Sequence, residues 1–119
     1  MKLYYSSEKL ERQCTSVREA RRLFGGDLAL ANKLLARIYY LQREDLLTLI
    51  IRQPALRFHN LKGKYQGLFA IDVKTRREPW RIIMEPLDDN GIPYDPCHID
   101  EIADMTKTIL IREVSKHYE

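Results

Sequence analysis

Apolar residues in the first half of the chain recur at the spacing of α-helices. From 28 to 41 they return every three or four positions, which places them on one helix face, and Asp27 can cap the start of this helix. Ser16 and Glu19 have the spacing of a capping box, and Gly25 is placed to end the helix that they begin. The pattern therefore predicts two successive amphipathic helices.

The hydrophobic pattern changes at Pro54. A short helical segment at 44–51 is expected to end before this residue, because proline disfavours helical geometry in the residue that precedes it. Beyond it, apolar and polar residues alternate in segments 67–73 and 80–87, and segment 108–114 is rich in β-branched residues. Alternation places successive side chains on opposite faces of a sheet, so we expect three strands here.

The order of these elements predicts an α+β fold. Together with a short strand at 2–6, it indicates a single domain over 1–119, with N-terminal helices packed on one face of a small antiparallel sheet. Residues 75–79 link two of the strands as a hairpin. In this arrangement Lys74 and Arg81 lie on the open face of the sheet, away from the core.

Positive charge is concentrated in about one fifth of the chain. Residues 57–81 contain seven basic residues and two acidic ones, a net charge of +5, whereas the whole chain carries +3. The remainder is therefore mildly acidic. A confined basic segment favours a polyanionic partner, with phosphate as the commonest anion, and a solvated basic surface is the alternative.

Segment 58–67 combines groups that suit nucleic-acid binding. Lys62 and Lys64 flank Gly63, which lets the backbone approach a phosphate, and Tyr65 offers a ring on which a base can stack. A generic basic loop before a strand has a similar composition. The loop by itself therefore does not identify a function.

Other sequence features exclude several classes of protein. No stretch approaches the roughly 20 apolar residues that cross a bilayer, and the first residues do not resemble a signal peptide, so we expect a cytoplasmic protein without a membrane partner. Cys14 and Cys97 are too few for a disulfide scaffold. His98 lies close to Cys97, Asp95 and Asp100, but this spacing matches no zinc pattern, and we expect neither a metal nor a cofactor.

Four segments of the second half together resemble the HigB-type toxins of the RelE/ParE toxin–antitoxin superfamily. They are His59-Asn60-Leu61-Lys62-Gly63, Gly67-Leu68-Phe69-Ala70-Ile71, Trp80-Arg81-Ile82-Ile83 and the tail Glu113-Val114-Ser115-Lys116-His117-Tyr118. The resemblance covers about residues 55–119, and the helical first half agrees in its general order. It implies a RelE-like fold and ribosome-dependent mRNA cleavage, in which a ribose 2′-hydroxyl attacks its own phosphodiester without a metal.

The resemblance also implies roles for individual residues. Lys62 matches the family's loop lysine and Arg81 its strand arginine, and both would stabilise negative charge on the phosphate. His59 matches a loop histidine and is a candidate acid or base. At the tail, His117 is the candidate for proton transfer and Tyr118 for stacking or hydrogen bonding to the base.

Charge and position add Lys64, Lys74 and Arg76 as RNA contacts. The tail departs from the family pattern, because many relatives end in Asp-Tyr-His and this chain has no acid at that place, so that Lys116 could occupy the tyrosine position. For Arg81 the structural alternative is an ion pair with Glu85, and for the tail it is a frayed terminus.

The family implies a cognate antitoxin, HigA-like and DNA-binding, with the ribosome and its mRNA as further partners. Two other functions stay open, a ParE-like topoisomerase poison and a catalytically inactive module that binds its antitoxin. The set of His59, Lys62 and His117 favours the endoribonuclease, since binding alone does not require acid–base groups. The missing acid at the tail keeps the inactive module open.

Overall fold

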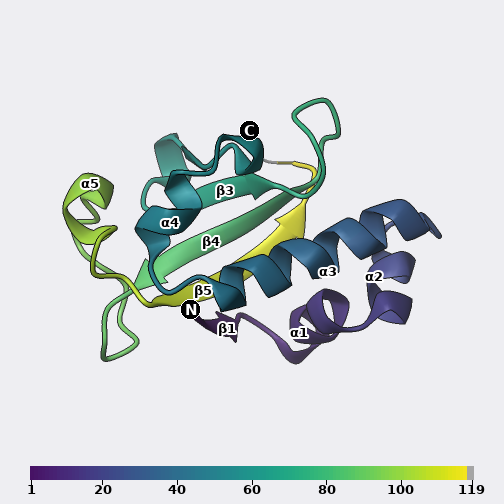
Figure 1. Ribbon diagram of the computed structural model, residues 1–119, viewed down its shortest axis with the longest axis horizontal. Helices are drawn as coiled ribbons and strands as arrows, with labels where there is room; N and C mark the ends of the chain where they lie inside the picture. Colours follow the sequence, from purple (N-terminus) through teal and green to yellow (C-terminus); the bar gives the residue numbers. More distant parts are fainter. Residues whose placement is uncertain (118–119) are drawn as a thin grey trace.

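The chain runs from an edge strand through its helices into the rest of a five-stranded sheet (Figure 1). The computed structural model describes residues 1–117. Over these residues it is a compact α+β domain with a Cα radius of gyration of 13.5 Å. Its elements are β1 (Lys2–Tyr5), α1 (Glu8–Thr15), α2 (Val17–Leu23), α3 (Leu28–Arg43), α4 (Leu47–Ile51), the 3-10 helix η1 (Pro54–Leu56), β2 (His59–Asn60), the 3-10 helix η2 (Gly63–Tyr65), β3 (Phe69–Asp72), β4 (Arg81–Leu87), α5 (Ile99–Ile102) and β5 (Thr108–Ser115).

The sheet has the strand order β1-β5-β4-β3-β2, and its pairing is mixed. β3 and β4 form the predicted antiparallel hairpin, with Asp72 opposite Arg81, and β5 runs antiparallel to β4. β1 is parallel to β5, with Lys2 opposite Thr108. The prediction of a wholly antiparallel sheet is therefore wrong at this edge. A short hairpin forces antiparallel pairing, whereas the long connection between β1 and β5 leaves their direction free.

Helices α2 and α3 begin where the sequence supplies capping side chains. The Ser16 hydroxyl accepts a hydrogen bond from the Glu19 amide (3.3 Å), and the Asp27 carboxylate accepts one from the Leu30 amide (3.1 Å). Both predicted helices are confirmed. Across residues 1–117, no helix combines the length and apolar character needed to cross a membrane.

Helix α1 is an element that the hydrophobic pattern does not predict. The Ser7 hydroxyl caps it by accepting a hydrogen bond from the Leu10 amide (3.1 Å). Only Leu10 and Cys14 of its eight residues are buried. Two apolar positions four residues apart are too few to establish a helical period.

One apolar cluster contains residues of both helices and strands. Leu34 of α3 shares this cluster with Ile71 of β3 and Ile82 of β4. Ala70, the neighbour of Ile71, instead belongs to a smaller second cluster with Ile83. The alternation predicted for these strands is confirmed, and the two faces of the hairpin contact different groups of residues.

The second face of the sheet is covered at Arg81. This side chain lies beside Asp72, and the two residues are 2% and 1% exposed. The Arg81 guanidinium donates from Nη1 to the carbonyls of Glu78 and Trp80, and from Nη2 to the carbonyl of Arg76 (3.0 Å). The prediction that Arg81 lies on an open face is therefore wrong. Alternation gives the face correctly, but the carbonyls of the hairpin close around the guanidinium.

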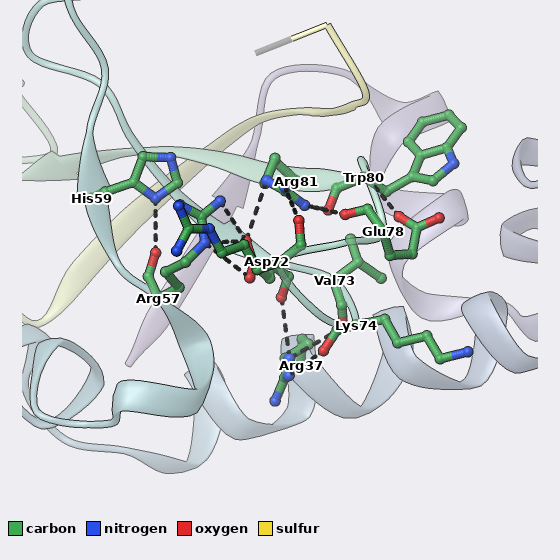
Figure 2. Close-up of polar contacts among 10 residues, drawn as sticks. Arg37, Arg57, His59, Asp72, Val73, Lys74, Glu78, Trp80 and Arg81 are labelled. Carbon is green, nitrogen blue, oxygen red and sulfur yellow. Dashed lines mark hydrogen bonds and ion pairs between the residues drawn. The ribbon is translucent and has the colours of Figure 1, made fainter. Parts of the chain in front are cut away.

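Arg37 of α3 holds the base of the same hairpin from the helical side (Figure 2). Its Nε donates to the carbonyls of Asp72 and Val73, both at 3.2 Å, and its Nη2 donates to the carbonyl of Lys74 at 3.3 Å. Carbonyls at the end of a strand need partners outside the sheet ladder. Arg37 provides these partners and so joins the end of β3 to α3.

Replacing Asp72 by Asn is expected to destabilise the fold. The amide keeps the shape of the side chain but removes the negative charge beside the Arg81 guanidinium, whose side chain is 3% exposed. An uncompensated buried charge costs about 3–5 kcal/mol of unfolding free energy. Equilibrium urea denaturation measures this loss, and exposed Lys74→Ala should change the same quantity by less than about 0.5 kcal/mol. Equal stabilities of the two variants would contradict the importance of the pair.

The two thiols are expected to react at very different rates. Burial raises the pKa of Cys14 to about 12. At pH 8 the reactive thiolate is then a fraction of about 10⁻⁴ of that group. Burial and, to a smaller extent, Glu85 also raise the pKa of Cys97, but this side chain is partly exposed. Iodoacetamide labelling followed by mass spectrometry should modify Cys97 first, and Cys14 only as the chain unfolds in urea; early labelling of Cys14 would argue against the packing of α1.

Candidate active site

The loop that follows η1 begins at a residue with unusual backbone geometry. Arg57 has φ 51° and ψ 53°, in the left-handed region, and is the only residue other than glycine with a positive φ in the range 1–117. An L-residue adopts this conformation at a cost of about 1–2 kcal/mol. Two residues later, His59 pairs with Ala70 of β3. The loop is thus turned and then fixed to the edge of the sheet.

Three of the predicted site residues line one cavity. Its volume is about 630 Å³, within the range of about 300–1,000 Å³ that is typical of ligand sites. Its lining consists of Arg57, His59, Asn60, Leu61, Lys62, Tyr65 and His117. His117 comes from the opposite end of the sequence, two residues after the end of β5, and its amide donates to the Ser115 hydroxyl at 3.1 Å. The fold therefore brings His59, Lys62 and His117 together.

The His59 ring is held in one orientation by its own loop. Its Nδ1 lies 2.7 Å from the carbonyl oxygen of Arg57. A carbonyl can only accept, so Nδ1 carries the proton in this contact and Nε2 of the neutral ring is left as an acceptor. Nε2 is buried and has no hydrogen-bond partner among residues 1–117. A buried acceptor without a donor is costly, and a ligand hydroxyl would supply the missing hydrogen bond once the atoms that cover Nε2 move aside.

The Asp72 carboxylate is shared by two arginines (Figure 2). Arg57 Nη2 lies 3.0 Å from Asp72 Oδ1, and Arg57 Nε donates to Oδ1 and Oδ2 at 3.2 and 3.1 Å. Arg81 Nε lies 3.2 Å from the same Oδ1. That approach is an ion pair without hydrogen-bond alignment, since Arg81 Nε has no hydrogen-bond partner among residues 1–117. Figure 2 shows Arg57 between His59 and Asp72.

Arg81 does not line the cavity with the other predicted site residues. Its side chain is 3% exposed, compared with 32% for that of Arg57. The alternative ion pair with Glu85 does not form either, because Glu85 pairs with Arg112 of β5 at 3.0 Å. Arg81 pairs instead with Asp72, and its guanidinium is enclosed by the carbonyls of the hairpin.

The three predicted RNA contacts are exposed, and none of them lines the cavity. Lys64 lies in η2, with its Nζ 5.2 Å from the centre of the Tyr65 ring. Lys74 and Arg76 lie in the hairpin that links β3 to β4. Tyr118 falls outside the described residues.

Arg57 is a site residue that the sequence reasoning missed. The sequence places it within the basic segment, but its position depends on a left-handed backbone and on a pairing with Asp72, fifteen residues away. No local pattern marks either feature, because arginine has no preference for the left-handed region. Its place in the site emerges from tertiary structure.

A second hollow lies at helix α2 and the two glycines that follow it. Its volume is about 700 Å³, and it is lined by Val17, Arg18, Arg21, Arg22, Gly25 and Gly26. It is slightly larger than the cavity around His59, but it contains no group that transfers protons near neutral pH. Both hollows are lined by cationic side chains, but of the two it is the cavity around His59 that also contains acid–base groups.

Comparison of the chain with models of known protein families gives no match, and comparison with curated protein sequences gives none either. The residues themselves and the geometry of the cavity are therefore the grounds for a functional assignment.

Proposed function

We propose that this protein is a RelE/HigB-type toxin, an endoribonuclease that cleaves mRNA on the ribosome. The proposal includes the RelE-like arrangement, in which N-terminal helices cover one face of the sheet. The observation that carries it is the cavity that gathers His59, Lys62 and His117 from distant parts of the sequence. These residues lie in the segments that resemble the HigB-type toxins.

The proposed reaction is an internal transfer of the phosphodiester. The ribose 2′-oxygen bonds to phosphorus while the bond from phosphorus to the 5′-oxygen breaks, which leaves a 2′,3′-cyclic phosphate and a 5′-hydroxyl. One group must accept the proton of the 2′-hydroxyl, another must donate a proton to the leaving oxygen, and cations must stabilise the charge on the phosphorane. No external nucleophile enters.

The surroundings of the two histidines support a division of this work. His59 leaves Nε2 as an acceptor, because Nδ1 donates to the Arg57 carbonyl, and this suits the group that takes the proton from the 2′-hydroxyl. Nε2 is buried, so the atoms that cover it must move aside when RNA binds. His117 is exposed and lines the same cavity, which suits the group that protonates the 5′-oxygen. Lys62, also exposed, would place an ammonium beside the phosphate.

The proposed partners follow from the same function. Lys64, Lys74 and Arg76 are exposed cations that would contact RNA phosphates or ribosomal RNA. A HigA-like, DNA-binding antitoxin would silence the protein by covering this region or keeping it from the ribosome. Action on the ribosome would place the protein in the cytoplasm.

Replacing His117 by Ala is expected to lower mRNA cleavage by about 100-fold or more, because proton transfer by a positioned side chain contributes about 10²–10⁴ to the rate. His117 is exposed, so its loss should leave the urea denaturation midpoint unchanged. Cleavage is measured by mapping mRNA 5′ ends after induction in a bacterial host, with translated and untranslated forms of one message. Cleavage restricted to the translated form supports the proposal.

Lys62→Ala should also lower cleavage, whereas Lys33→Ala, an exposed lysine of α3, serves as the matched control and should cleave like the original protein. Arg81→Ala is unsuitable as a test of catalysis, because this buried side chain also stabilises the hairpin. Growth arrest without cleavage would favour a topoisomerase poison. The absence of both effects would favour an inactive module that binds its antitoxin.

A further inference from the structure

We propose that Arg57, and not Arg81, supplies the guanidinium that contacts the RNA phosphate in this cavity. Arg57 would then be a catalytic residue of the proposed nuclease, and Asp72 and Arg81 would be positioning residues that hold it. The inference rests on the proposed function. It concerns which residue of the site meets the scissile phosphate.

Arg81 has no edge available for a phosphate. Its Nη1 and Nη2 donate to carbonyls of the hairpin, and its Nε lies against Asp72. Its side chain is 3% exposed. A phosphate would have to replace these carbonyls, and the hairpin would have to open to admit it.

Arg57 has the access that Arg81 lacks. It lines the cavity together with His59, Lys62 and His117, and its side chain is 32% exposed. A guanidinium has five N–H donors in a planar fork, and here the Nε and Nη2 side faces Asp72. The Nη1 edge is left for a ligand, in a geometry that suits two phosphate oxygens.

The charges also favour an anion at this position. Asp72 carries one negative charge and contacts two guanidinium groups, so the trio keeps a net charge of +1. Lys62 adds a second positive charge to the cavity lining. Because Asp72 also fixes the Arg57 side chain before any ligand binds, little of its rotational freedom remains to be lost on binding.

Arg57 further links the phosphate contact to the proton acceptor. Its carbonyl accepts the hydrogen bond from His59 Nδ1, while its guanidinium extends toward Asp72. One residue in a left-handed conformation therefore sets both the orientation of the imidazole and the place of the cation. A shift of this residue would move both groups together.

The test compares Arg57→Ala and Arg57→Lys with Arg52→Ala, in which an exposed arginine outside the cavity lining is removed. Removal of Arg57 leaves Asp72 in its ion pair with Arg81 but takes away the hydrogen bonds to this buried carboxylate, so Arg57→Ala is expected to lower the urea denaturation midpoint. Arg57→Lys keeps a cation beside Asp72 and should lose less stability. Binding is therefore compared in buffer without urea, where the denaturation curve shows each variant to be folded, and ¹⁵N NMR should still show the proton of His59 on Nδ1, because the backbone carbonyl is retained.

The first measurement is binding of an oligoribonucleotide whose 2′-hydroxyls are methylated, so that no cleavage can occur. Arg57→Ala should weaken binding about tenfold or more and lower the slope of log affinity against log salt by about 0.7, the value for one phosphate contact in a single strand. Arg57→Lys should recover part of the affinity but not the fork geometry. Arg52→Ala should bind like the original protein.

The second measurement is cleavage of translated mRNA by the same variants. The original protein could bind RNA without cleaving it, while Arg57→Ala loses the binding. That outcome would reject the nuclease and keep the phosphate contact of Arg57. If Arg57→Ala binds and cleaves RNA as well as the original protein does, the inference about Arg57 is overturned and the nuclease proposal is kept. An original protein that does not bind the methylated RNA at all would also overturn it.

Discussion

The pairing of the buried Asp72 carboxylate with two arginines is the constraint on which the rest of the site depends. Asp72 ends β3, Arg81 begins β4, and Arg57 begins the loop that carries His59. A carboxylate that is 1% exposed is stable as an ion only beside opposite charge. One side chain thus joins the hairpin to the loop, and the position of the cavity follows from this junction.

The helical half of the chain reaches the same junction through Arg37. Its guanidinium binds the carbonyls at the end of β3, directly where Asp72 lies. Loop residues are ordinarily the most mobile part of a domain, and function requires them to be supported by rigid elements. Here a helix and two strands meet at the base of the loop that carries His59, so the candidate site is built on a loop with fixed ends.

The sequence predicts the elements of this fold better than their relations. Ser16 and Asp27 mark the helix starts because capping is a local interaction, and the two faces of β3 follow from simple alternation. The parallel direction of β1 is not visible in any local pattern, since it depends on a strand at the far end of the chain. Local rules describe a strand, and its partner is decided by the whole chain.

The site shows the same division between local and tertiary information. His59, Lys62 and His117 can be selected from the sequence because a resemblance marks them, and the cavity gathers all three. Arg81 can be assigned to a face, but alternation does not reveal that the hairpin carbonyls cover it. Arg57 is missed because its place in the cavity lining depends on a left-handed turn that no local pattern marks.

Counting charge along the sequence also has a physical limit in this protein. The segment 57–81 carries a net charge of +5, but the two arginines on Asp72 are largely engaged within the fold. The lysines at 62 and 64 are exposed beside the cavity, and the other exposed cations of the segment lie on the hairpin. The exposed cations therefore form two separate groups, with Arg57 at the boundary between internal pairing and the cavity. The charge available for binding is the charge that remains after internal ion pairs are subtracted. These pairs are known only from the tertiary structure, so the sequence alone does not give the available charge.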